Sequence, residues 1–113
     1  MSENNLSANE WSRAAWENNA GFWDERMGEG NDFVEILIWP AVTRLLDVQP
    51  GQRILDVACG NGLTSRRLAK LGARVLAVDF SAEMLRYAAA RSQEYSGQID
   101  YRLVDATDEA ALL

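Results

Sequence analysis

The sequence predicts an α/β fold with a parallel sheet, preceded by N-terminal helices. Three short apolar segments, residues 53–58, 74–79 and 99–104, alternate with two segments of helical periodicity. Strands that alternate with helices in this way are joined by right-handed crossovers and lie parallel in one sheet. Pro50-Gly51 is a turn signal between this part and a tryptophan-rich N-terminal region. We therefore expect a helical cap over residues 1–50 and a ligand-binding α/β unit over residues 51–113.

Two helices are predicted before the turn. The first has an apolar face at the spacing i, i+4, i+7 and i+11, formed by Trp16, Ala20, Trp23 and Met27. The second has a face at helical spacing formed by Phe33, Ile36, Leu37, Ala41, Leu45 and Val48. Pro40 lies within this second pattern and predicts a kink or a new helix start. We expect both faces to pack on the sheet edge and on each other.

The α/β unit alternates strands, turns and helices. Cys59-Gly60-Asn61-Gly62 follows the first strand, and the next helix is expected to turn Leu68 and Leu71 inward and to end at Gly72. The second strand is apolar on both faces, as a buried parallel strand must be. Ser81 stands where the N-cap of the following helix belongs.

Composition and charge exclude several classes of site. With no histidine and one cysteine in 113 residues, neither a histidine-assisted nucleophile nor a Cys/His zinc cluster can form, and we expect no metal. The net charge of −6 argues against a nucleic-acid partner, and we expect Arg66, Arg67 and Lys70 on the solvent face of a helix. No apolar run has the length of a membrane helix, and residues 1–10 do not resemble a secretory signal. We therefore expect a cytoplasmic protein without a membrane partner.

A carboxylate stands at the end of each predicted strand: Asp56, Asp79 and Asp105. Ligands bind at the carboxyl ends of parallel strands. Glycines in the turn after the first strand let backbone N–H groups approach a ligand where a helix begins. Asp79 follows Gly60 by about 20 residues, the spacing of an acid that accepts from both hydroxyls of a ribose. Together these features predict a nucleoside site across the strand ends.

Two nucleoside cofactors compete for such a site. A nicotinamide dinucleotide favours G-x-G-x-x-G, whereas residues 60–65 read G-N-G-L-T-S. Its pyrophosphate would also be repelled by Asp56, whereas a ligand with an ammonium group would be attracted. S-adenosyl-L-methionine has an amino-acid end, a ribose, an adenine and no phosphate, so the charge pattern favours it. Half of an NAD-binding dehydrogenase is the less favoured interpretation.

Three motifs, in order, resemble those of the class I S-adenosylmethionine-dependent methyltransferases, most closely the small-molecule group. Residues 54–62 resemble the first motif, with its L-D-V-A-C-G-x-G loop, and residues 78–85 resemble the next, D-x-S-x-x-M-L. Residues 103–107 resemble the third, an acid followed by alanine. Only Ala58 departs from the strict G-x-G-x-G loop. The resemblance implies strands 3, 2 and 1 of a seven-stranded Rossmann-like sheet ordered 3-2-1-4-5-7-6.

The resemblance also implies a role for each matching residue. The methionine end would be held by Asp56 and by the turn of Ala58, Cys59, Gly60, Asn61 and Gly62. Asp79 would accept from the ribose hydroxyls, and Phe80 and Met84 would flank the adenine. Asp105, beside the Ala106 backbone, would accept from the adenine amine. Trp23, in a helix that covers the cofactor, would lie nearest the methionine end.

Each of these residues also has a purely structural interpretation. Asp56 could cap the following turn, Asp79 and Asp105 could be turn residues, and Phe80 and Met84 could be core. Cys59 is more readily a small loop residue than a nucleophile, because no basic group near it in sequence lowers its pKa. The tryptophans could simply pack two helices on the sheet.

The resemblance implies methyl transfer from S-adenosylmethionine to a small-molecule acceptor. The catalytic residue is unknown, because in this family it usually follows strands 4 and 5, which are not among the three strands predicted here. A non-catalytic cofactor-binding or assembly module derived from a methyltransferase is the alternative. A domain truncated in this way would leave the Ile54–Val57 edge unpaired. We therefore expect self-association or a complementing chain at that edge.

Overall fold

The structure is a computed structural model that describes residues 7–105. The N-terminal region forms α1 (Ala8–Met27), the π-helical turn η2 (Val34–Ile38) and α2 (Trp39–Leu46). The rest forms β1 (Arg53–Val57), α3 (Leu63–Lys70), β2 (Arg74–Asp79), α4 (Ala82–Arg91), the 3-10 turn η3 (Gln93–Tyr95) and β3 (Ile99–Leu103). The predicted α/β fold is therefore confirmed. Among the described residues, no helix is both long and apolar enough to cross a bilayer.

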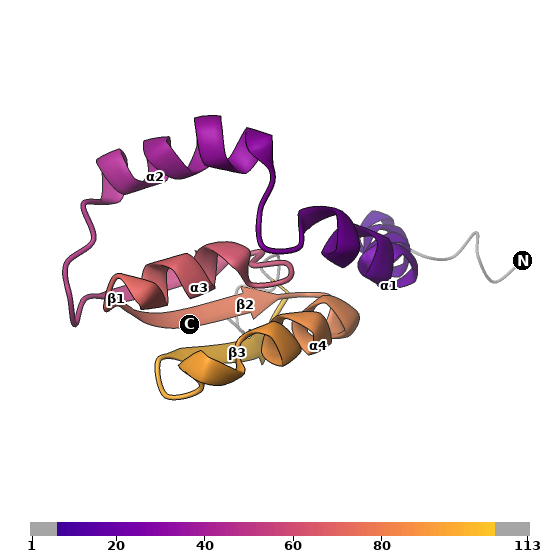
Figure 1. Ribbon diagram of the computed structural model, residues 1–113. Helices are drawn as coiled ribbons and strands as arrows, with labels where there is room; N and C mark the ends of the chain where they lie inside the picture. The colour runs from indigo at the N-terminus through magenta and orange to yellow at the C-terminus, as the bar shows by residue number, and fades with distance from the viewer. Residues whose placement is uncertain (1–6, 106–113) are drawn as a thin grey trace, which may run out of the picture.

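The three strands form one parallel sheet in the order β1-β2-β3. This order is the 3-2-1 part of the sheet implied by the sequence motifs. Both crossovers place their helices on the same side of the sheet, so α3 and α4 lie next to each other (Figure 1). The core lies between these helices and the strands, and it is built around Leu68, Val75, Ala77 and Ile99.

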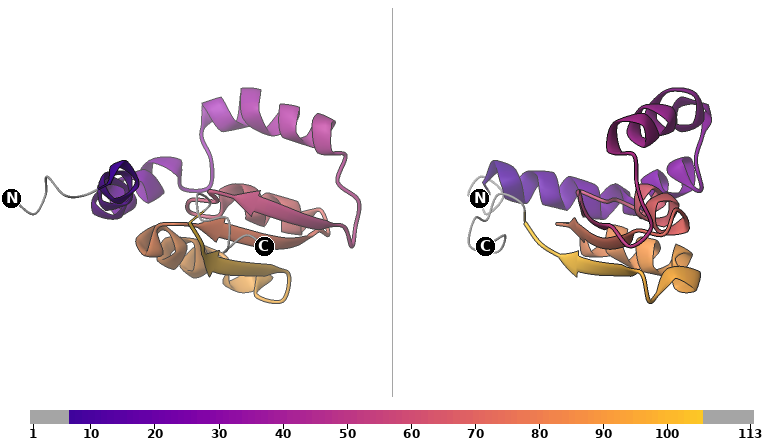
Figure 2. Two further views of the ribbon diagram at one scale, coloured as in Figure 1. Left: turned by 180° about the vertical axis from the view of Figure 1, so that it is seen from behind. Right: turned by 90° about the vertical axis from the view of Figure 1, so that its left-hand side faces the viewer.

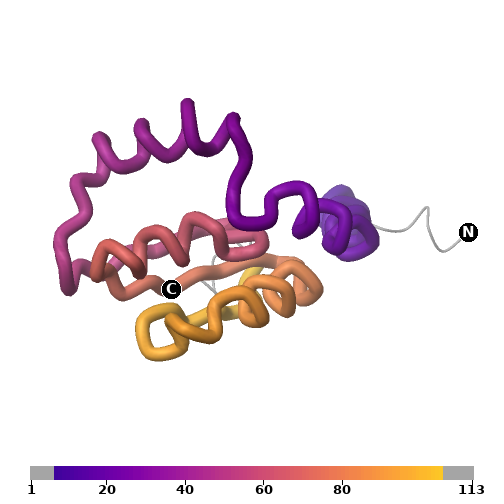
Figure 3. The backbone as a smooth tube through the Cα atoms, in the orientation of Figure 1, coloured from indigo at the N-terminus to yellow at the C-terminus, as the bar shows by residue number. Residues whose placement is uncertain are grey.

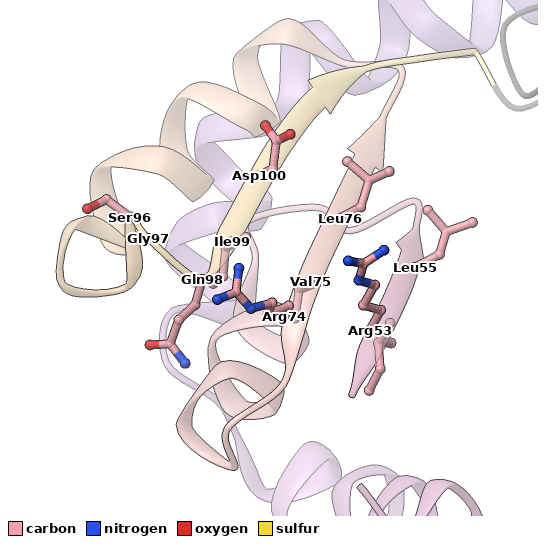
Figure 4. A pocket seen from close by; sticks show the side chains of 11 residues that line it. Arg53, Leu55, Arg74, Val75, Leu76, Ser96, Gly97, Gln98, Ile99 and Asp100 are labelled. Atoms are coloured by element: carbon pink, nitrogen blue, oxygen red, sulfur yellow. The ribbon is translucent and has the colours of Figure 1, made fainter. Parts of the chain in front are cut away.

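The opposite face of the sheet is open, which differs from the expectation that β2 is buried on both sides. Val75 and Ala77 are buried under the helices, whereas Leu76 is 38% exposed and Leu55 of β1 is 55% exposed. Seen from behind, the strands lie in front of α3 and α4 (Figure 2). On this face Leu55, Leu76 and Arg74 help to line a hollow of about 540 Å³ (Figure 4). Because α3 and α4 share one side, no described helix covers the other.

Local start and stop signals are mostly confirmed. The Ser81 hydroxyl accepts a hydrogen bond from the Met84 backbone N–H at 3.2 Å and caps α4. Gly72 ends α3 with φ +98°, a left-handed conformation that favours glycine. Pro40 lies in the first turn of α2, where the π-helical η2 changes to an α-helix, but Ile38 and Trp39 are helical, so the chain continues through this point without the predicted new start. Leu71 was expected inward but is 43% exposed, because α3 ends one residue before it.

Helix α1 buries Ala20 and partly buries Met27 of the predicted apolar face, but not its two tryptophans. Its inward positions are spaced i, i+4, i+7, i+11 and i+14, namely Arg13, Glu17, Ala20, Asp24 and Met27. Trp16 and Trp23 are 41% and 40% exposed. The physical reason is that α1 packs on α4 and on the turn after β1, which present polar groups. The buried face of α1 is accordingly polar.

The predicted apolar face of the second helix is mostly exposed. Phe33, Ile36 and Leu45 are 62%, 77% and 82% exposed. The tube trace shows α2 standing apart from the sheet, on the far side of α3 (Figure 3). Its contact with the core is made by Trp39, which packs against the core cluster and lies under the Arg67 guanidinium. The expectation that this face packs on the sheet edge is therefore wrong for the described residues.

Candidate functional site

The turn between β1 and α3 has an unusual backbone. Ala58, Gly60 and Gly62 have φ values of 57°, 58° and 82°, all in the left-handed region. The Gly62 N–H donates to the Cys59 carbonyl at 3.0 Å and closes the turn. A Cβ at Gly62 would collide with the Tyr101 hydroxyl, so only glycine fits there. The turn predicted from the glycine pattern is therefore formed at the end of β1.

Asp79 links this turn to the start of α4. One carboxylate oxygen accepts from the Gly60 N–H at 2.9 Å, and the other accepts from the Ser81 N–H at 3.0 Å. The residue is 7% exposed. The carboxylate is thus fixed where the first two strands end, at the position of the nucleoside site predicted from the sequence.

A cavity of about 190 Å³ lies across the ends of the three strands. It is lined by Asn9, Val57, Ala58, Val78, Asp79, Phe80, Val104 and Asp105. Four of the predicted site residues, Ala58, Asp79, Phe80 and Asp105, are therefore brought together. Helix α1 lies at this same end of the sheet, toward which the strand arrows point (Figure 1).

The other predicted residues of the first two motifs lie around this cavity without lining it. The Asp56 carboxylate accepts from the Ser65 hydroxyl at 2.6 Å, in the first turn of α3. Burial, and secondarily the Asp79 charge, raise the pKa of Asp56 above its ordinary value, although the Ser65 hydrogen bond opposes this shift. Met84 is 5% exposed, with its methyl group beside Gly60.

Cys59 has the properties of a structural residue. It is buried, and its backbone N–H donates to the Val78 carbonyl at 3.0 Å. Burial and the carboxylates of Asp56 and Asp79 raise the pKa of its thiol far above neutral. The thiol is therefore protonated at pH 7, which disfavours a nucleophilic role.

Asp105 is contacted by the N-terminal half of α1. Its carboxylate accepts from the Asn9 amide at 2.5 Å and from the Arg13 guanidinium at 3.1 Å. The same guanidinium lies over the Phe80 ring, 5.8 Å from the ring centre. The sequence analysis did not identify Asn9 or Arg13. Ala106, predicted beside the adenine, lies outside the described residues.

The C-terminal half of α1 contacts the glycine turn through Asp24 and not through Trp23. Trp23 packs on Trp16 and Phe22, with ring centres 5.8 and 5.6 Å apart, and does not line the cavity. Asp24 accepts from the Asn61 amide at 3.1 Å and from Arg91 at 2.7 Å. Sequence reasoning missed Asp24, although its place on the polar face of α1 could have been read from the helical spacing.

Charge strongly favours the ionised form of Asp24. Burial alone would raise the pKa of this carboxyl, but hydrogen bonds from Arg91 and Asn61 outweigh it and hold the pKa below its usual value. Arg66 was expected on a solvent face but is 4% exposed, since its guanidinium donates to the Asn61 carbonyl at 2.6 Å.

In the described part of the chain, no group of three or more His, Cys, Asp or Glu could hold a metal.

Residues 54–112, slightly more than half of the chain, match the model of a family described as a methyltransferase domain. Among proteins of known name, the chain is similar to a ubiquinone biosynthesis O-methyltransferase of Xanthomonas campestris pv. campestris (strain B100). The two are 48% identical over 62 residues, which are 55% of this chain and 26% of the relative. The matched part thus spans about a quarter of the length of that relative.

Solved structures share the fold. Magnesium protoporphyrin IX methyltransferase (ChlM) from Synechocystis PCC 6803, with bound SAM, has a TM-score of 0.67 and 27% identity. That alignment covers 91% of this chain and 57% of ChlM. The [4+2]-cyclase SpnF has a TM-score of 0.55 and 28% identity, over 61% of this chain and 26% of SpnF.

These matches agree with the strand order, with the glycine turn after β1 and with the acid at the end of β2. The family model also begins within β1 and runs through all three predicted motifs. The chain therefore belongs to the methyltransferase domain family, and its sheet has the Rossmann-like fold of the class I S-adenosylmethionine-dependent methyltransferases.

Proposed function

We propose that this chain forms the cofactor-binding part of an enzyme that transfers a methyl group from S-adenosyl-L-methionine to a small molecule. The observation that carries the proposal is the position of Asp79. It is fixed at the end of β2, 7% exposed, on a cavity that also contacts the turn after β1, Phe80 and Asp105. A carboxylate in this place can accept hydrogen bonds from two neighbouring hydroxyls of a ribose.

The residues present fit this cofactor. Bound there, it would supply a methyl group on a positively charged sulfur. The turn 58–62, with Asp56, would hold the amino-acid end, and the negative charges of Asp56 and Asp79 attract its cationic groups. Phe80 and Met84 would flank the adenine, and Asp105, with the Ala106 backbone beside it, would accept from the adenine amine. The same carboxylates oppose a pyrophosphate, which argues against NAD.

Residues of this chain would contribute binding and orientation. Alignment of two reactants is worth several kcal/mol in general, on the order of 7–11 in the best cases. The proposed small-molecule acceptor is supported by the name of the Xanthomonas relative, which is an O-methyltransferase of ubiquinone biosynthesis. The catalytic residue is not assigned.

A second candidate is a non-catalytic cofactor-binding or assembly module. The open edge of β1 favours it, because within residues 7–105 this strand pairs with β2 alone. We propose that a second copy, or a chain that carries further strands, pairs with this edge.

Titration calorimetry tests the proposal. The 113-residue chain is titrated separately with S-adenosylmethionine, S-adenosylhomocysteine, NAD and adenosine. We expect both sulfur nucleosides to bind and NAD not to bind. Binding of NAD in preference to S-adenosylhomocysteine, or no binding of either sulfur nucleoside, would overturn it. If S-adenosylmethionine binds, but no methyl group is transferred even after a chain with further strands is added, the second candidate is favoured.

A further inference from the structure

The side chain of Asn61 is fully engaged inside the protein. Asn61 stands between Gly60 and Gly62 in the turn after β1 and is 4% exposed. Its amide N–H groups donate to the Asp24 carboxylate at 3.1 Å and to the Gly28 carbonyl at 3.2 Å. Its amide oxygen accepts from the Leu63 N–H at 3.3 Å, at the start of α3. A glycine-rich turn has wide conformational freedom, so these contacts restrict it.

Asp24 is itself held from another element. The Arg91 guanidinium, at the end of α4, donates to both carboxylate oxygens of Asp24, at 2.7 and 3.1 Å. Such a two-point contact fixes orientation as well as distance. Asp24 is 7% exposed, so the pair is shielded from water on the Asp24 side. The position of Asn61 thus depends on α1 and α4 together.

A second arginine supports the backbone of the same residue. Arg66 of α3 donates to the Asn61 carbonyl at 2.6 Å and to the Ser92 hydroxyl at 3.4 Å. Glu29 pairs with both Arg66 and Arg91, at 3.2 and 3.4 Å. Asn61 belongs to the first sequence motif, but the groups that hold it, Asp24 of α1, Arg66 of α3 and Arg91 of α4, belong to none of the three motifs.

We infer that Asp24 and Arg91 are positioning residues, which hold Asn61 and thereby keep the glycine turn in the shape that receives the amino-acid end of the cofactor. The inference rests on the proposed function. It assigns no contact between either residue and the cofactor. Asp79 also accepts from the Gly60 N–H of this turn, but it has a second contact with the Ser81 N–H, and Phe80 is contacted by Arg13. The ribose and adenine end therefore depends less on Asp24 and Arg91 than the amino-acid end does.

This separation gives the inference a specific signature. The affinity for S-adenosylhomocysteine, which carries the amino-acid end, should fall when the contacts of Asp24 and Arg91 are removed. Adenosine, which lacks that end, should bind nearly as before. If these contacts only stabilised the fold, their loss would lower the apparent affinity for both ligands equally, in proportion to the loss of folded protein.

The experiment compares Arg91→Gln with Arg86→Gln. Both arginines lie on α4, and both pair with a carboxylate, Arg86 with the exposed Glu83 at 2.8 Å. Calorimetry at pH 7 should show that Arg91→Gln and Asp24→Ala each lower the affinity for S-adenosylhomocysteine about tenfold, as expected for the loss of a charge-assisted hydrogen bond. Adenosine affinity should change less than about twofold, and Arg86→Gln should alter neither ligand.

A nuclear magnetic resonance measurement of the Asn61 side-chain amide provides a readout that needs no ligand. Its proton shifts should move in Arg91→Gln and stay unchanged in Arg86→Gln, even if Asp24→Ala does not fold. Equal losses of both ligands, or an unmoved Asn61 amide in Arg91→Gln, would overturn the inference. Failure of the wild-type chain to bind S-adenosylhomocysteine would instead count against the proposed function.

Discussion

Under the proposed function, the Asp79 carboxylate accepts hydrogen bonds both from the protein backbone and from the ribose of the cofactor. Its carboxylate oxygens already accept from the backbone N–H groups of Gly60 and Ser81. Each carboxylate oxygen has a second lone pair, so ribose hydroxyls can be bound without breaking those contacts. The structural interpretation of Asp79 as a turn residue and its ligand role are therefore compatible.

Asp79→Ala should lower the affinity for S-adenosylhomocysteine by about 2 kcal/mol, since charge-assisted hydrogen bonds are lost. Calorimetry measures this directly. Ser81→Ala is the control, because it removes the α4 cap and costs about 1 kcal/mol of stability while Asp79 stays in place. Unchanged binding in Asp79→Ala would remove the main support for the site.

Asp56→Asn should weaken S-adenosylhomocysteine more than adenosine, because it removes a negative charge near the amino-acid end. Burial raises the pKa of Asp56, so the protonated carboxyl favours folding and that stability is lost as pH rises through the folded-state pKa. The ligand-free Asp56→Asn variant should therefore melt at a higher temperature than the wild type at pH 7. Equal losses for both ligands would mean that Asp56 serves the turn and not the ligand.

Much of the site is predictable from the sequence because it follows the strands. Ala58, Asp79, Phe80 and Asp105 follow the ends of β1, β2 and β3, which parallel pairing brings together. Asp24 is different, because 37 residues separate it from Asn61. Contacts of this kind depend on how α1 docks, which no short motif encodes.

Among the elements, α1 departs furthest from the predictions. Hydrophobic periodicity favours a face with Trp16 and Trp23, because apolar spacing is the stronger signal. The surface on which α1 docks is instead polar, with Arg91 at one end of α4 and the Glu83 N–H at the other, where Glu17 accepts at 3.3 Å. The strands, in contrast, were predicted to within one residue, since Gly51, Gly72 and Gly97 precede their apolar runs and an aspartate stands at or near the end of each.

The docking of α1 should depend on pH. The pKa of Asp24 is lowered in the folded protein, so its contribution is present above the ordinary carboxyl range and is lost as pH falls through the folded-state pKa. The hydrogen-exchange protection factors of residues 8–27, which correct for the intrinsic pH dependence of exchange, should therefore fall on acidification below about pH 4. In Asp24→Asn, these protection factors should already be lower at pH 7 and should depend less on pH. A wild-type helix with the same protection from pH 7 to pH 3 would contradict this prediction.

The whole molecule has one covered and one open side. The helices α3 and α4 bury one face of the sheet, while Leu55, Val57 and Leu76 on the other are 55%, 48% and 38% exposed. Aromatic side chains of α1, namely Trp11, Trp16, Phe22 and Trp23, are also exposed. Surfaces of this extent are uncommon on monomeric proteins and favour association. The sequence could not predict that one face of the sheet is open or that α2 lies apart from the sheet. Apolar periodicity shows which residues share a face, but not which element covers that face.

The edge of β1 therefore leads to a prediction about assembly. Within residues 7–105, Ile54–Val57 has a strand partner on one side only. Unpaired backbone N–H and C=O groups of an edge strand pair readily with another chain, and adjoining apolar side chains add to the gain. The net charge of −6 opposes self-association by electrostatic repulsion, and added salt screens this repulsion, so association should increase as ionic strength rises.

Sedimentation at low micromolar concentration is the test of that prediction. The chain should sediment as a dimer or larger species, or become compact only when a chain with further strands is added. Leu55→Lys should shift the wild-type distribution toward monomer, because a charge beside an open edge discourages pairing. Leu45→Lys is the matched control, since it makes the same substitution at an 82% exposed residue of α2, outside the sheet, and should leave the distribution unchanged. A compact, stable wild-type monomer that is indifferent to Leu55→Lys would show that the β1 edge does not drive assembly.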